Sequence, residues 1–238
     1  MKKVLLSFLS LVLVVSSLAT FSLAANLPLK VQADGKTLVE APECFTDNGI
    51  TYAPVRSLAE GLGGIVGYTE MSGNSFIISI LMPNGVWINI QNTPGDNYYF
   101  KADYRLCDDI PEQNVLKNIF HDIYNHNLVG DGPDSGYTQN SIYITSSCDL
   151  IYKQYTYYCP VRLFGLLAGF NVDWNNDTQT VTLTEHMSAS SETYSALVSN
   201  RTSASYMESK LYFYLTDIAA NGNPSDWDAF FQSINQEY

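Results

Sequence analysis

The chain has 238 residues, of which 46% are hydrophobic and 13% aromatic, and its formal net charge is −12 at pH 7. This apolar and aromatic content is sufficient for a packed core and excludes an intrinsically disordered chain. The negative net charge would repel other negatively charged molecules. We therefore expect neither nucleic acid nor an anionic lipid surface as a ligand.

The first 24 residues predict a secretory signal peptide rather than part of the fold. Lys2 and Lys3 precede an apolar run that ends at the small residues 22–24, which is the usual order in such peptides. We expect cleavage after Ala24, a secreted or cell-wall-associated (extracellular) protein, and no membrane contact afterwards. An uncleaved anchor is the alternative, because the apolar run is nearly long enough to span a bilayer.

Two hairpins are expected between residues 29 and 52. Asp34-Gly35 and Asp47-Asn48-Gly49 are turn sequences between short apolar runs, and Asp-Gly and Asn-Gly favour tight hairpins. Centring the second turn between Asn48 and Gly49 places Cys44 opposite Ala53.

A segment containing Pro-Val-Arg occurs twice, at an offset of 106 residues. The first copy runs from Tyr52 through 54–56 to Tyr68, and the second runs from Tyr158 through 160–162 to Trp174. Each copy predicts a strand, a short helix, a glycine, a strand, a turn and another strand.

The two prolines predict where the helices begin. Proline lacks an N–H that would be unpaired at the first helical position, and its fixed φ suits a helix, so we expect helices to start at Pro54 and Pro160. Gly63-Gly64 and Gly169 predict their ends.

This pattern of a glycine-bearing hairpin, Tyr-x-Pro-Val-Arg, a short helix and Val-x-Trp/Tyr resembles the copper amine oxidase N-terminal-like domain, or stalk domain, of exported Gram-positive proteins. The resemblance covers roughly Leu29 to Leu183. It implies a stalk domain over residues 25–187 with an insertion at 92–137, followed by a helical C-terminal appendage at 188–238. The expected fold class is α+β, with two related β-hairpin/short helix/β-hairpin units that form antiparallel sheet wrapped on short helices.

The family name raises the question of amine oxidation. Copper in those enzymes is held by three histidines, two of them in a His-x-His pair, and the quinone cofactor is made from a tyrosine before an acid. This chain has His121, His126 and His186 without such a pair, and Asn97-Tyr98 is followed by Tyr99. We therefore expect no amine oxidase activity, no cofactor and no metal. The acidic residues of 131–136 lack the spacing of a calcium loop and are interpreted as a solvated turn.

Arg56 and Arg162 occupy the first helical turn, where a cation opposes the helix dipole. Each is therefore expected to have a partner, either a carboxylate or backbone carbonyls. A structural ion pair is favoured over a paired anion site. The residues with an expected structural role are Pro54, Arg56, Tyr68, Pro160, Arg162 and Trp174.

Four cysteines permit three disulfide pairings. A hairpin centred between Lys153 and Gln154 places Cys148 opposite Cys159, which predicts a bridge between them. Cys44 and Cys107 form the second expected pair. The alternative is that all four stay reduced.

Helices are expected in the insertion and in the appendage. Residues 111–124 have an apolar stripe with Asp109 as the expected cap, and 191–199 and 205–220 form further helices. The stripe of the last one is expected to pack against its own domain. Trp87 and Trp174 are expected in the core, whereas Trp227 is expected at the surface.

Two functions fit these observations. The first is a non-enzymatic stalk or binding module that holds a cell-wall polymer, glycan or surface protein on aromatic side chains. The second is a cell-wall or glycan hydrolase, because a pair of catalytic carboxylates leaves no local sequence signature.

Overall fold

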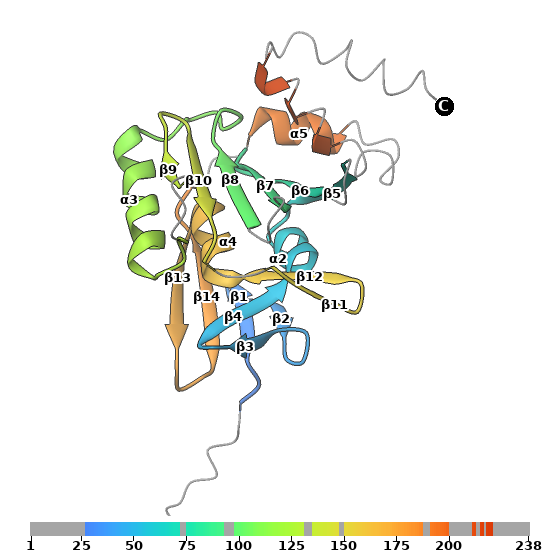
Figure 1. The fold of residues 1–238 in the computed structure, drawn as a ribbon, viewed down its shortest axis with the longest axis vertical. Coiled ribbons are helices and arrows are strands. Elements are labelled where there is room, and N and C mark those ends of the chain that lie inside the picture. The colour runs from blue at the N-terminus through green and yellow to red at the C-terminus, as the bar shows by residue number, and fades with distance from the viewer. Residues whose placement is uncertain are drawn as a thin grey trace, which may run out of the picture.

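The computed structural model describes residues 27–71, 75–92, 98–130, 135–147, 150–187 and 191–199, together with 211–212, 215–216 and 218–220. The expected signal peptide, Cys148 and Trp227 lie outside these residues. The fold is mixed α+β, with mostly antiparallel sheets and few, short helices (Figure 1). In this part of the chain no helix is long and apolar enough to cross a membrane.

The first sheet joins the two ends of the domain. It has the order β13-β14-β1-β2 and consists of β1 (Lys30–Ala33), β2 (Lys36–Glu40), β13 (Phe170–Asn175) and β14 (Thr180–Glu185). β1 pairs antiparallel with β2 and parallel with β14. The expected turn at Asp34-Gly35 is confirmed, with φ of 49° and 74°, which are the positive values that a tight hairpin requires.

The second sheet joins the hairpins that precede the two Pro-Val-Arg motifs. It has the order β11-β12-β4-β3 and consists of β3 (Phe45–Asp47), β4 (Ile50–Pro54), β11 (Ile151–Lys153) and β12 (Thr156–Pro160). Asp47 pairs with Ile50, as expected for the turn at 48–49. In the other hairpin Lys153 pairs with Thr156, so the turn is centred one residue later than expected. Gln154 and Tyr155 form it with φ of 49° and 63°.

The third sheet is the largest and carries the candidate site. Its order is β5-β6-β7-β8-β10-β9, from β5 (Ile65–Glu70), β6 (Phe76–Leu81), β7 (Trp87–Asn92), β8 (Tyr98–Asp103), β9 (Gly136–Tyr137) and β10 (Ser141–Thr145). Val86, Ile88 and Ile90 lie on its inward face, and all three are fully buried. Residues 98–103 form β8, and a turn follows it.

The repeated helices begin one residue after the prolines, so the expectation that they begin at proline is wrong. Helix α2 (Val55–Gly61) and helix α4 (Val161–Leu167) follow Pro54 and Pro160, whose ψ values of 127° and 119° are still those of a strand. Both helices end as expected before a glycine in the left-handed region, Gly63 at φ 83° and Gly169 at φ 86°. The second helix is the more buried of the two.

The remaining helices cover the third sheet from two directions (Figure 1). Helix α3 (Gln113–Asn125) packs near β9, β10 and α4, and Glu112 rather than Asp109 precedes its first turn. Helix α5 (Glu192–Ser199) and the helical residues of 211–220 pack on the opposite face, where Leu211 and Leu215 form a small core with Ile65, Leu81, Trp87, Leu106 and Leu197. The expectation that this stripe packs against its own domain is confirmed.

Candidate functional site

An exposed group of aromatic rings lies where the second and third sheets meet. It consists of Tyr68 on β5, Phe76 on β6, and Tyr152 and Tyr157 on the β11–β12 hairpin, and we call it the aromatic surface. Ring centroids are 5.6 Å apart for Tyr68 and Phe76, 6.2 Å for Tyr68 and Tyr157, and 4.6 Å for Tyr152 and Tyr157. The rings form a continuous layer because each lies within ordinary contact range of the next.

The aromatic surface is open to solvent at both ends. Tyr68 is 37% exposed and Tyr152 is 55% exposed, whereas Phe76 is buried beneath them. The planes of Tyr68 and Tyr157 differ by 20°, so their faces are almost parallel. Burial, followed by the hydrogen bond with Tyr68, raises the pKa of Tyr157, so its hydroxyl stays protonated at neutral pH.

A second feature, the cleft, lies on the outer face of the third sheet under the C-terminal helical residues. It has a volume of about 350 Å³. Side chains along β7 and β8 alternate between the two faces of the sheet, so the residues that line the cleft lie on this face and the residues between them lie in the core. The lining residues are Trp87, Asn89, Gln91, Tyr99, Lys101, Arg105, Tyr212, Thr216 and Ala220.

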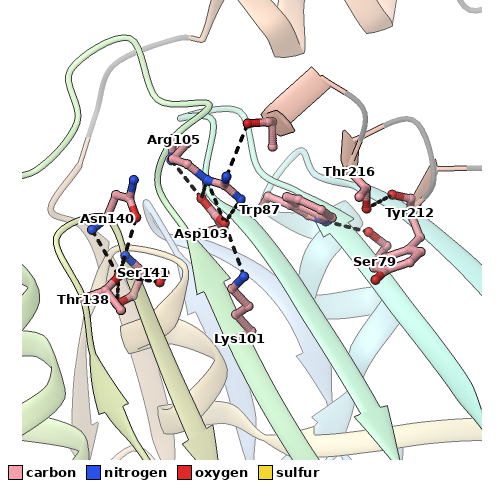
Figure 2. A network of polar contacts seen from close by, with 11 residues as sticks. Ser79, Trp87, Lys101, Asp103, Arg105, Thr138, Asn140, Ser141, Tyr212 and Thr216 are labelled. Carbon is pink, nitrogen blue, oxygen red and sulfur yellow. Dashed lines mark hydrogen bonds and ion pairs between the residues drawn. The ribbon is translucent and has the colours of Figure 1, made fainter. Parts of the chain in front are cut away.

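A buried carboxylate holds the cations at one end of the cleft (Figure 2). Asp103 is 1% exposed and accepts hydrogen bonds from Arg105 Nε at 2.9 Å and Arg105 Nη2 at 2.6 Å. Lys101 Nζ lies 3.6 Å from the same carboxylate. Arg105 Nη1 also donates to the carbonyl of Ala219 at 3.3 Å, which ties the C-terminal helical residues to β8.

The floor of the cleft contains the indole of Trp87 and the carboxamides of Asn89 and Gln91. Trp87 Nε1 donates to Ser79 Oγ at 2.7 Å, and its ring contacts Tyr212 at 6.1 Å between centroids (Figure 2). Asn89 is 7% exposed, and its Oδ1 has no hydrogen-bond partner among the residues that the structure describes. A buried polar atom of this kind is costly unless another group pairs with it.

The arginines of the repeat do not have equivalent partners. Arg56 Nη1 donates to Glu60 Oε1 at 2.9 Å, and both side chains are about half exposed. The expected carboxylate partner is therefore present for Arg56, on the next turn of its own helix. Position 166 in the second copy is leucine, so Arg162 has no such acid four residues on. The ion pair of Arg56 is therefore not repeated at the equivalent position of the second copy, and the structural role of Arg162 stays a prediction.

The aromatic ends of the repeat lie in different surroundings. Tyr68 belongs to the aromatic surface, whereas Trp174 is 42% exposed near the end of the edge strand β13. Trp174 was expected in the core and is not, because an edge strand has a neighbour on one side only. Trp87 is 4% exposed, which confirms its expected burial.

The three described cysteines are buried free thiols. The expected bridge between Cys44 and Cys107 is absent, and Cys44 Sγ instead donates to the carbonyl of Leu29 at 3.3 Å. Cys159 packs opposite Ala53 in the β4–β12 pair, and its expected partner Cys148 lies outside the described residues. Burial raises the pKa of Cys44 to about 11 and that of Cys107 to about 12.

Neither surface was located from the sequence. Isoleucine alternates with Trp87, Asn89 and Gln91 in this stretch of the sequence. This alternation predicts that β7 has one apolar face and a second, more polar face. No comparable local signal joins this face to residues 212–220, or joins Tyr68 to Tyr157, because those contacts link distant parts of the chain.

No protein-family model, curated protein or solved structure matches this chain. The similarity to stalk domains therefore stays a prediction that depends on the two Pro-Val-Arg segments. Among the described residues, no group of three or more histidine, cysteine, aspartate or glutamate side chains is placed to hold a metal ion.

Proposed function

We propose that this protein is a non-enzymatic extracellular or cell-wall-associated binding module without amine oxidase activity, whose partner is a cell-wall polymer or glycan. The aromatic surface carries this proposal. A sugar ring presents an apolar face of C–H groups and a rim of hydroxyls, and tyrosine presents an apolar ring face with a hydroxyl at its edge. Tyr68, Tyr152 and Tyr157 offer these features in one continuous layer.

The composition of the aromatic surface favours an uncharged stretch of polymer over an anionic one. Its members are uncharged side chains on a chain whose formal net charge is −12, and long-range repulsion disfavours a polyanion. Several weak stacking contacts along one layer suit a repeating ligand, because consecutive sugar units engage consecutive rings.

The proposed architecture is that of a stalk domain built from two related units. Support comes from the matched elements β4, α2, β5 and β6 in the first copy and β12, α4, β13 and β14 in the second. Glycines at the same relative position end both helices in the left-handed conformation. In this proposal residues 188–238 are the helical appendage, and a surface protein is the alternative partner.

Co-sedimentation tests the proposed function. The chain from Ala25 to Tyr238 is mixed with isolated Gram-positive cell walls, and the soluble fraction is assayed for released sugars and peptides. We expect retention on the walls without release. Tyr152→Ala and Tyr68→Ala are expected to weaken retention about tenfold each, which corresponds to roughly 1.4 kcal/mol.

Tyr124→Ala is the matched control, because Tyr124 is 61% exposed on α3 and lies outside the aromatic surface. Equal loss in the control and in the two test variants contradicts a specific surface. Release of wall fragments supports the hydrolase alternative instead, and absence of retention favours a protein partner.

A further inference from the structure

The cleft has charged side chains and a buried carboxamide, which the aromatic surface lacks. Its volume of about 350 Å³ lies at the lower end of the range for small-molecule sites. Ring faces of Trp87, Tyr99 and Tyr212 supply apolar lining, and the polar groups lie between them.

The first recognition group is the carboxamide of Asn89. It lines the cleft, it is more than nine-tenths buried, and its Oδ1 is unpaired among the described residues. A ligand N–H that pairs with this oxygen would satisfy an acceptor that has no partner among the described residues.

The second recognition group is the pair of cations at the end of the cleft. Lys101 and Arg105 share one buried carboxylate, Asp103, so this end of the cleft has an excess of positive charge. Arg105 directs its donors to Asp103 and Ala219. Lys101 contacts Asp103 only at 3.6 Å, and its side chain is 37% exposed, so its ammonium keeps donors for a second anion.

Adjacent strands place the two groups side by side. Asn89 of β7 pairs with Lys101 of β8 in the register of the sheet, so both side chains leave the same face at neighbouring positions. A ligand that pairs with both therefore has an amide N–H and a carboxylate on one compact body.

We propose that the cleft binds an N-acylated amino sugar that carries a carboxylate. The amide N–H of the acyl group donates to Asn89 Oδ1, the carboxylate pairs with Lys101, and the sugar ring lies among the faces of Trp87, Tyr99 and Tyr212. This site is separate from the aromatic surface and needs no contribution from it.

Titration calorimetry with three monosaccharides tests the proposal. N-acetylmuramic acid has both groups, N-acetylglucosamine has the amide without the carboxylate, and glucuronic acid has a carboxylate without the amide. We expect the first to bind the chain from Ala25 to Tyr238 at least about tenfold more tightly than either of the others, a difference of roughly 1.4 kcal/mol.

Two variants assign the contacts. Lys101→Met is expected to remove the preference for N-acetylmuramic acid over N-acetylglucosamine, and Asn89→Leu is expected to remove its preference over glucuronic acid. Lys153→Met changes the same charge on β11, where Lys153 lies over Phe45, and is expected to leave both preferences intact. Thermal unfolding checks that each variant is folded, and the exposed Lys101 allows a test even if Asn89→Leu does not fold.

Equal affinity for the three sugars, or preferences that persist in Lys101→Met, would overturn the proposal. Failure to bind N-acetylmuramic acid would also overturn it and leave wall binding by the aromatic surface untouched. Loss of wall retention in Tyr152→Ala with unchanged binding of N-acetylmuramic acid would support two independent sites.

Discussion

Ala53 and Cys159 face each other across β4 and β12, and each occupies the same position in its own copy of the repeated segment. Tyr52 pairs with Pro160 and Pro54 pairs with Tyr158, so the pairing is symmetrical about these two residues. Both side chains are fully buried. The contact between the two copies therefore depends on small side chains at its centre.

The burial of Cys159, Cys44 and Cys107 predicts a loss of stability at alkaline pH. Each folded-state pKa is raised from the ordinary value of 9.0, with burial as the largest cause. The unfolded chain therefore releases these protons first as the pH rises. The stabilising contribution is complete below pH 9 and falls as the pH rises from there toward the folded-state pKa values, by roughly 1.4 kcal/mol per thiol for each pH unit.

Urea unfolding at pH 7.5 and pH 10 measures this loss. A variant with Cys44→Ala, Cys107→Ala and Cys159→Ala is expected to lose less free energy of unfolding over the same interval, since three of the titrating groups are gone. The same loss in both proteins would show that other groups, such as the buried Tyr104, account for the alkaline sensitivity.

Gly85→Ala is expected to be strongly destabilising. Gly85 has φ of 83°, and a Cβ at this position would overlap the backbone carbonyl of Leu106 and approach Cys107 Cα to 2.7 Å. Backbone cannot move aside as a flexible side chain can. We expect a cost of about 2–4 kcal/mol, which combines the strained φ with displacement of the turn after β8.

Gly49→Ala is the matched control for this prediction. Gly49 has φ of 80° with open space around the added Cβ, so its substitution costs only the backbone strain, about 1 kcal/mol. Thermal unfolding of the two variants separates the effects. Equal shifts in melting temperature would mean that the contact with residues 106 and 107 relaxes without cost.

The hairpin turns show which parts of the fold could be predicted from the sequence. The turns at 34–35 and 48–49 contain Gly and Asn in left-handed conformations, and this chemistry is readable locally. The β11–β12 turn places Gln154 and Tyr155 in the same region, where their residue types give no signal. The expected hairpin centre was therefore one residue too early.

The site was harder to predict than the fold, because its contacts span long separations. Arg105 and Ala219, which are joined by a hydrogen bond in the structure, are 114 positions apart in the sequence. Exposure of Trp174 depends on the edge position of β13. Local periodicity predicts which face a residue occupies and does not predict what lies on that face.

Arg56→Leu is expected to have a small effect on stability. Its ion pair with Glu60 joins two half-exposed side chains four residues apart, and such pairs contribute about 0.3–0.5 kcal/mol. Comparison with Glu60→Leu and the double variant in urea gives the coupling energy. A coupling well above 1 kcal/mol would show that the pair fixes the fold, as the sequence suggested.

Asp103→Asn is expected to be far more damaging than loss of the weakly held cation, Lys101. Asp103 is 1% exposed and accepts hydrogen bonds from both the side chain and the backbone N–H of Arg105. Neutralising it leaves Arg105 and Lys101 as neighbouring like charges, each with a side chain that is 37% exposed. Breaking a buried pair in this way costs about 3–5 kcal/mol.

Lys101→Met provides the comparison, because it leaves the hydrogen bonds between Asp103 and Arg105 intact and removes a contact at 3.6 Å. We expect it to cost less than about 1 kcal/mol. Urea unfolding of both variants at pH 7 measures the difference. Similar losses in the free energy of unfolding for the two variants would mean that Lys101 and Arg105 hold Asp103 equally. A small loss for both would mean that water reaches the carboxylate when the C-terminal helical residues move away from β8.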